Sequence, residues 1–101
     1  MAIVRITQPA AQDVRAACDR YRQGDRNLLA NFLKQFKRAR NRIGLFPEST
    51  LPDYRNLRRV PILRTDYVIY YSFEGEEALV KAVLHGSRER ETLDEILGRR
   101  A

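Results

Sequence analysis

The residues of this chain most able to do chemistry stand directly after an apolar segment, Ala78–Leu84. They are His85, Ser87 and Arg88. Polar side chains at the end of a buried strand are held rigidly near the surface, where binding and catalytic residues concentrate. A histidine transfers protons near neutral pH, and an arginine binds phosphate or carboxylate groups. This strand end is therefore the first place to look for a functional site.

These residues also have structural interpretations. A hydrogen bond to neighbouring backbone is favoured for His85 over proton transfer or contact with a partner. For Arg88, an ion pair with Glu89 or Glu91 is favoured over a functional contact. The chain has one histidine and one cysteine, too few for a metal site, and no phosphate-binding glycine loop. No Ser/His/Asp arrangement is evident beyond Ser87 beside His85. We therefore expect no metal and no cofactor.

A second group of candidates is basic. Its members are Lys34, Lys37, Arg38, Arg40, Arg42, Arg55, Arg58, Arg59 and Arg64. Residues 1–65 hold fourteen Lys and Arg against five Asp and Glu, whereas residues 66–101 hold five against eight. Cations in the last turns of a helix are favoured by its dipole, so one interpretation is a solvated face. The alternative is a surface that meets DNA, RNA or an acidic protein, without sequence-specific readout of nucleic acid.

A β-hairpin must position the strand-end residues. Two apolar runs, Tyr67–Phe73 and Ala78–Leu84, flank the polar link Glu74–Glu77, in which Gly75 can take a positive φ. Both faces of each run are largely apolar, which is typical of strands in the middle of a sheet. Alternation divides the second run between two faces, with Leu79 and Val83 on one and Ala78, Val80 and Leu84 on the other.

The N-terminal part predicts a strand and a helical hairpin. Met1–Ile6 forms the strand, and Thr7 then caps a helix that admits Pro9 in its first turn. Gly24 ends this helix, and Asp25 caps the next, which Gly44 stops. The apolar stripe of the first helix comprises Val14, Ala17, Cys18 and Tyr21, and its solvent face comprises Asp13, Arg15, Asp19, Arg20 and Arg22. The second stripe comprises Leu28, Leu29, Phe32, Leu33, Phe36, Ala39 and Ile43.

The rest of the chain completes a small sheet. Leu45–Asp53 predicts a loop, and Tyr54–Leu63 a third strand that Pro61 confines to an edge or a bulge. At the end, Thr92 and Glu95 fit a capping box, and a short C-terminal helix is favoured by the apolar residues Leu93, Ile96 and Leu97. The predicted fold class is α+β, in the order β-α-α-β-β-β: an N-terminal strand and an antiparallel helical hairpin packed on a small antiparallel β-sheet.

Composition sets the class of protein. With 101 residues and 44% hydrophobic content, we expect one domain, residues 1–101, with a core small enough that a partner would add stability. The single cysteine, Cys18, excludes an internal disulfide, fits a reducing compartment and fills the core. No apolar run reaches the roughly 18 residues of a membrane span, and no signal-peptide core is present. We expect a cytoplasmic protein that contacts no membrane.

Several motifs carry a family resemblance. A-A-Q-D-V opens the first helix at Ala10, a proline loop follows the second helix, D-Y-V-I-Y-Y begins at Asp66, and V-L-H-G-S-R-E begins at Val83. With the order of elements, they resemble the ParE/RelE superfamily of bacterial toxins from type II toxin–antitoxin modules. The resemblance covers nearly the whole chain, and V-L-H-G-S-R is closer to ParE than to RelE.

The resemblance implies one of two activities. ParE-like proteins inhibit DNA gyrase by trapping its cleaved DNA complex, whereas RelE-like proteins cut mRNA in the ribosome. RelE-like cleavage uses a basic cluster that activates a 2′-hydroxyl, stabilises the phosphorane and protonates the leaving oxygen. Here Arg88 matches one arginine of that cluster, and Arg58 and Arg59 replace its lysines, although arginine is too firmly protonated to be a general base. Its other arginine and its tyrosine are replaced by Val68 and by Leu93 or Asp94.

We therefore expect a ParE-like toxin that binds and inhibits DNA gyrase and is not an enzyme. The resemblance also implies a cognate antitoxin, whose disordered segment folds over an apolar groove and the basic face to give a hetero-oligomer. The residues expected to contact the target or the antitoxin are Lys34, Lys37, Arg38, Arg59, Arg64, His85 and Arg88. One alternative is an inactive binding module; the other is a ribosome-dependent mRNA endonuclease that uses Arg58, Arg59, His85 and Arg88.

Overall fold

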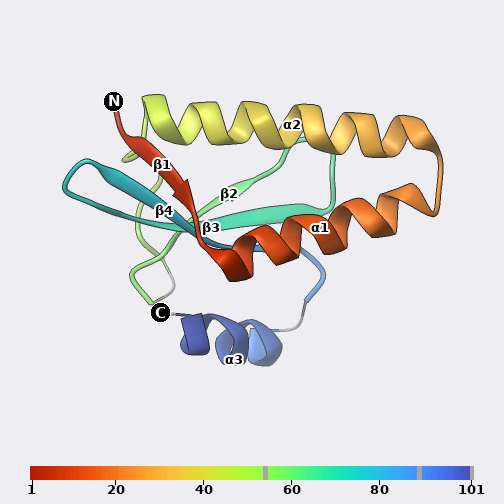
Figure 1. The fold of residues 1–101 in the computed structure, drawn as a ribbon. Coiled ribbons are helices and arrows are strands. Elements are labelled where there is room, and N and C mark those ends of the chain that lie inside the picture. The colour runs from red at the N-terminus through yellow and green to blue at the C-terminus, as the bar shows by residue number, and fades with distance from the viewer. Residues whose placement is uncertain (54, 89, 101) are drawn as a thin grey trace.

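The computed structural model describes residues 1–53, 55–88 and 90–100, and within them it contains a mixed α+β fold (Figure 1). The elements follow the predicted order, including the C-terminal helix. Their bounds are β1 (Ile3–Ile6), α1 (Gln8–Arg22), α2 (Arg26–Leu45), β2 (Arg58–Pro61), β3 (Tyr67–Glu74), β4 (Glu77–His85) and α3 (Arg90–Arg100).

The four strands form one sheet in the order β1-β4-β3-β2. The hairpin strands β3 and β4 therefore occupy the middle, as their two apolar faces predicted. The hairpin turns at Gly75, whose φ is +61°, a conformation that costs glycine little. Strands β2, β3 and β4 pair antiparallel, and β1 joins β4 in parallel. Pro61 lies on the edge strand β2, where its missing N–H breaks no bond within the sheet.

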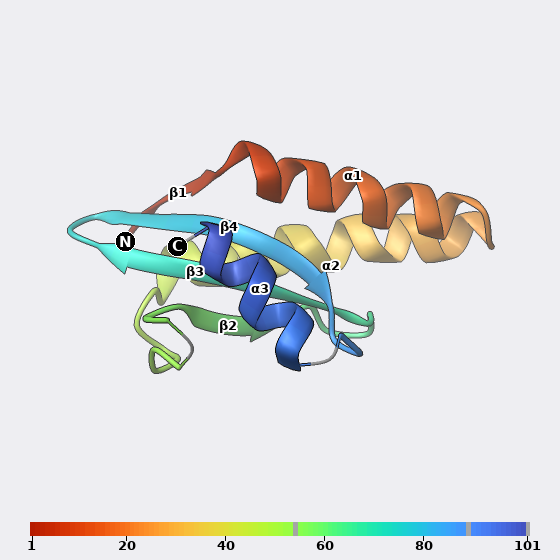
Figure 2. The ribbon, with the colours of Figure 1, turned by 90° about the horizontal axis from the view of Figure 1, so that it is seen from below.

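Helices cover both faces of the sheet. Figures 1 and 2 show α1 and α2 on one face and α3 across the other. The capping residues of the two long helices are the predicted ones: the side chain of Thr7 accepts the Ala10 N–H and that of Asp25 accepts the Asn27 N–H. The core under α1 and α2 includes the fully buried Phe32, Ile43, Ile69, Tyr71, Val80 and Val83. The smaller core under α3 comprises Leu57, Val68, Tyr70, Ala82, Leu84 and Leu97.

A β-bulge at Lys81 changes which residues face each core. The register between the two hairpin strands shifts there, so Lys81 has no register partner on β3. One extra residue reverses the alternation of side chains beyond it. Val80 and Val83 consequently share the core under α1 and α2, whereas Leu84 packs under α3. The sequence-based prediction that Val80 and Val83 lie on different faces of the strand is therefore wrong. Both faces are apolar, so the pattern of hydrophobic residues does not reveal the extra residue.

Three predicted boundaries also differ from the structure. Helix α2 continues through Gly44 to Leu45, and Gly44 instead permits close approach of β1: an added Cβ would lie 3.4 Å from Val4 Cγ2. The third strand is shorter than predicted, because Asn56 has a φ of +64° and cannot extend it. The predicted start of that strand, Tyr54, lies outside the described residues. Helix α3 begins at Arg90, so Thr92 lies inside it rather than capping it.

Asp13 on α1 does not face water, contrary to the sequence-based prediction. Its side chain is only 13% exposed, and its Oδ2 accepts the backbone N–H of Val83 at 3.0 Å. Strand β1 has already ended at this level of the sheet, so the carboxylate takes the place of a neighbouring strand. The guanidinium of Arg100 on α3 donates to the same carboxylate at 2.5 and 3.1 Å. Asp13 thus ties α1, β4 and α3 together around one edge of the sheet.

Candidate functional site

The end of β4 places His85 in a defined hydrogen-bonded position. Its side chain is 19% exposed, and its ring meets the ring of Tyr67 edge-on at 5.3 Å between centroids. The backbone N–H of Ser87 donates to Nδ1 at 3.1 Å, and the Ser87 hydroxyl lies 2.6 Å from the same nitrogen. The expected hydrogen bond to neighbouring backbone is therefore present.

This arrangement decides what the histidine can do. Because Nδ1 accepts a backbone N–H, the proton of the neutral ring is assigned to Nε2, which lies 3.7 Å from the Asp66 carboxylate. That distance is longer than a hydrogen bond, and Asp66 is 70% exposed. A nucleophilic triad needs the base free to take the hydroxyl proton and a buried acid to orient it. Ser87, His85 and Asp66 do not meet this requirement, and the structure gives them a turn-stabilising role.

Arg88 lies exposed in the turn after β4, and its backbone N–H donates to the carbonyl of His85 at 3.2 Å. The structure describes no ion pair between its side chain and Glu91. The other expected partner, Glu89, lies outside the described residues. The Arg88 guanidinium is thus presented to solvent at a fixed point of the backbone.

The two arginines of β2 point to opposite faces of the sheet, as neighbours in a strand must. Arg58 Nη1 donates to the carbonyl of Thr50, on the side of α1 and α2. This bond helps to hold the loop after α2, which is also fixed by the Tyr71 hydroxyl donating to the carbonyl of Pro47 at 2.8 Å. Arg59 instead lines a small hollow on the α3 side, with a volume of about 90 Å³. Its lining comprises Asp53, Arg59, Tyr70, Gly86, Arg90, Leu93, Asp94 and Leu97.

Three of the four residues considered for nuclease chemistry, Arg58, Arg59 and His85, do not converge on one point. Arg58 on β2 lies opposite Tyr71 on β3, and His85 on β4 lies opposite Tyr67 on β3. Four residues of β3 separate these positions, which corresponds to about 13 Å. Arg59 lies on the other face. No single phosphate can contact all of these side chains at once.

The basic residues of α2 lie on its exposed surface. Lys34, Lys37, Arg38, Arg40 and Arg42 are all exposed. Lys34 and Lys37 lie opposite the buried Phe32 and Phe36, whereas Arg38 and Arg42 face β2. Arg64 adjoins them, because its carbonyl accepts the side-chain amide of Asn31 at 3.1 Å. The structure therefore places Lys34, Lys37 and Arg38 on the exposed surface of α2, with the backbone of Arg64 beside Asn31. The turn that carries Arg64 continues to Asp66, which lies 3.7 Å from His85.

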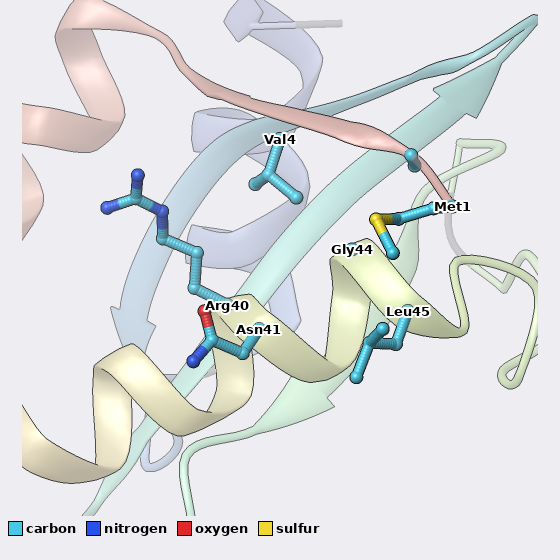
Figure 3. Close-up of a pocket in the computed structure, with 7 residues that line it drawn as sticks. Met1, Val4, Arg40, Asn41, Gly44 and Leu45 are labelled. Carbon is cyan, nitrogen blue, oxygen red and sulfur yellow. The ribbon is translucent and has the colours of Figure 1, made fainter.

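On the other side of α2, an open hollow of about 410 Å³ lies against β1 (Figure 3). Met1 and Leu45 lie at one end of it and Arg40 at the other. Asn41, Val4, Ala2 and Gly44 complete its lining. This hollow contains no pair of groups suited to acid–base chemistry, so it offers a contact surface rather than a reaction centre.

Two further properties bear on chemistry. Burial raises the pKa of the Cys18 thiol, with Arg22 opposing and Asp19 adding to the shift, so the thiol is protonated and weakly nucleophilic at neutral pH. Within the described ranges, no group of three or more His, Cys, Asp or Glu side chains is placed to hold a metal ion.

No helix in those ranges is long and apolar enough to cross a membrane.

Two features of the structure were not predicted from the sequence, the position of Leu63 and the partner of Arg100. Leu63 and Pro61 lie beside Arg38 and Arg42, and only the edge position of Pro61 was foreseen. An apolar residue, Leu63, at the end of the predicted edge strand was the available signal. Arg100 had no signal, since its partner is 87 residues away in the chain.

The chain is similar to known proteins in both sequence and fold. Residues 4–90 match the model of a family described as the ParE toxin of the type II toxin–antitoxin system, parDE. A solved structure titled "Chromosomal ParDE TA system from P. aeruginosa" is similar, with a TM-score of 0.65 and 18% sequence identity. The likeness covers 84% of this chain and 96% of that chain, and at this identity it concerns the fold. No curated protein matches the chain.

Proposed function

Since this chain belongs to the ParE toxin family of type II toxin–antitoxin systems, we propose that it inhibits DNA gyrase by binding to it. Binding traps the cleaved DNA complex and blocks replication, and the toxin itself makes and breaks no bond. A cognate antitoxin neutralises it in the cytoplasm. The proposed contact residues for gyrase or the antitoxin are Lys34, Lys37, Arg38, Arg59, Arg64, His85 and Arg88.

The observation that carries this proposal is the separation of the candidate nuclease residues. A ribonuclease must place its base, its acid and its cationic groups around one phosphate, each within about 3 Å of its target. Arg58 and Arg59 lie on opposite faces, and Arg58 is bonded to the carbonyl of Thr50. His85 accepts a backbone N–H through Nδ1. These placements favour binding over RNA cleavage.

The charge distribution also supports binding. The chain carries a net charge of +6, and the cations of α2 are exposed on a rigid helix of 20 residues. An exposed cationic face accelerates association with an acidic protein surface, and salt screens the effect. Lys34 and Lys37 point directly away from the core, so they are placed to meet a large partner.

The test is incubation of the purified protein with DNA gyrase and supercoiled plasmid, with and without the antitoxin, scoring supercoiling and linearised DNA. Antitoxin-reversible inhibition is the expected result. The double variant Lys34→Glu/Lys37→Glu is expected to inhibit about tenfold less. A matched control, Arg15→Glu/Arg20→Glu, makes the same change of charge on α1. Equal losses in both variants would show that total charge, rather than the α2 face, decides binding.

Arg88→Ala tests the strand end in the same assay, because its exposed side chain can be removed without disturbing a core. A loss of inhibition would assign contact with gyrase to this turn. Absence of any effect of the wild-type protein on gyrase, at large excess, would refute the proposal. Cleavage of ribosome-bound mRNA would then identify an endonuclease, and intact mRNA would leave an inactive binding module.

A further inference from the structure

A small groove lies between α2 and the edge strand β2. Helix α2 contributes Gln35, Arg38, Ala39 and Arg42, and the other side is formed by Val60, Pro61 and Leu63. Strand β2 is the outermost strand of the sheet, so this groove opens along the sheet's edge. The turn that carries Leu63 is held against α2 by the bond from Asn31 to the carbonyl of Arg64.

The size of the groove indicates what it holds. Its volume is about 110 Å³, whereas sites for small molecules usually enclose about 300–1,000 Å³. The floor is apolar, since Ala39 and Val60 are nearly buried, and Leu63 at the rim is 62% exposed. A space of this size with these walls fits a single aliphatic side chain supplied by a larger partner.

The rim of the groove determines the charge of that partner. Arg38 and Arg42 flank the apolar floor, and none of the seven lining residues is acidic. Lys34 lies one turn before Arg38 on the same helix. A segment with carboxylates on either side of one aliphatic residue would therefore complement both the floor and the rim.

The backbone of β2 argues against the addition of another strand. The Ile62 N–H bonds to the carbonyl of Tyr67, so Val60 and Arg58 also point their backbone groups toward β3. The outward positions are Arg59 and Pro61, and Pro61 has no N–H to donate. A partner must then be held mainly by its side chains rather than by a new ladder of backbone hydrogen bonds.

We propose that the groove between α2 and β2 is a docking site for an acidic segment of the antitoxin, which inserts one aliphatic side chain beside Leu63 and pairs its carboxylates with Arg38 and Arg42. This inference rests on the proposed function, because it takes the antitoxin as the partner. It assigns the antitoxin to the side of α2 next to β2, beside rather than upon the outward-pointing Lys34 and Lys37.

The test measures the dissociation constant between the full-length protein and the antitoxin encoded beside it, by titration calorimetry. Leu63→Ala and Arg42→Glu are each expected to raise it by about tenfold or more. The matched controls are Leu28→Ala, an exposed leucine at the start of α2, and Arg20→Glu on α1, both expected to change it less than about twofold. All four side chains are exposed, so folding is retained, and circular dichroism checks this.

Each outcome is decisive. Tight binding that is equal in all variants would overturn the groove assignment and leave the proposed function intact. Failure of the wild-type protein to bind the antitoxin would overturn the groove assignment and the proposed neutralisation, whereas inhibition of gyrase is decided separately by the plasmid assay. Sedimentation of the protein alone tests whether a second copy of this chain occupies the groove. A self-associated species that Leu63→Ala abolishes would assign the groove to that copy and overturn the proposal.

Discussion

Replacing Asp13 by alanine tests the contact that joins three elements around the sheet edge. The substitution removes the acceptor of the Val83 N–H, and an orphaned buried donor costs about 1–3 kcal/mol. It also removes two charge-assisted bonds from Arg100, whose side chain is 23% exposed and can partly return to water. We therefore expect unfolding free energy to fall by about 2–3 kcal/mol, out of the roughly 5–15 kcal/mol typical of a small domain.

The assay is equilibrium unfolding in urea followed by circular dichroism, with thermal melting beside it. The expected loss corresponds to a decrease in Tm of about 10–20 °C for a chain of this size. Asp13→Asn retains an oxygen for the Val83 N–H and loses only the charge, so it should cost about 1 kcal/mol. Hydrogen exchange at the Val83 amide should accelerate in the alanine variant and much less in the asparagine variant.

A control on the same helix separates this contact from ordinary surface charge. Asp19 pairs with Arg22, and both side chains are about two-thirds exposed, so Asp19→Ala should not measurably change stability. Arg100→Ala completes a double-mutant cycle with Asp13→Ala, and we expect a coupling of about 1 kcal/mol or more. Equal unfolding midpoints for the Asp13 and Asp19 variants, or strict additivity in the cycle, would refute the reasoning.

Three other predictions concern the scaffold. Tyr71→Phe removes the hydroxyl bonded to the carbonyl of Pro47, so stability should fall by about 0.5–1.5 kcal/mol and limited proteolysis should cut the loop after α2 faster; an unchanged cleavage rate would contradict this. Gly75→Ala should cost about 1 kcal/mol through backbone strain alone, since no atom lies within 4 Å of the added Cβ, and unaltered urea unfolding would show that the turn relaxes freely. Cys18 should react with Ellman's reagent at pH 7.5 far more slowly in the folded protein than in guanidinium chloride, because burial raises its pKa; equal rates would indicate an accessible thiolate.

Much of the fold followed from local patterns. The helical stripe ending at Ile43, the caps Thr7 and Asp25 and the glycine of the hairpin each reflect a requirement that acts over a few residues. Two members predicted for that stripe, Leu28 and Leu33, are exposed, because they lie at its margins and not over the sheet. Such requirements are readable in sequence because each residue meets them through its immediate neighbours. The opposite orientations of Arg58 and Arg59 could also be read from the sequence, since adjacent residues of a strand face opposite sides, although the nuclease alternative grouped the two residues.

Tertiary structure decided what depends on the placement of distant segments. Asp13 appeared to be a solvent-facing helical residue until the end of β1 left the Val83 N–H open and α3 brought Arg100 across the sheet. The bulge at Lys81 was hidden because both faces of its strand are apolar. Packing of layers sets these contacts, and no periodicity within one segment encodes the position of another.

The difference between what the sequence determined and what the tertiary structure decided therefore has a physical cause. Sequence by itself determined the elements, their order, the basic character of α2 and the family to which its motifs point. Only the folded chain determined that Arg38 and Arg42 share a groove with Leu63, and that the strand-end residues are not among those that line it. Charge and apolarity belong to residues, whereas a site is a matter of distances, and those exist only after α2 and β2 have packed against the same sheet.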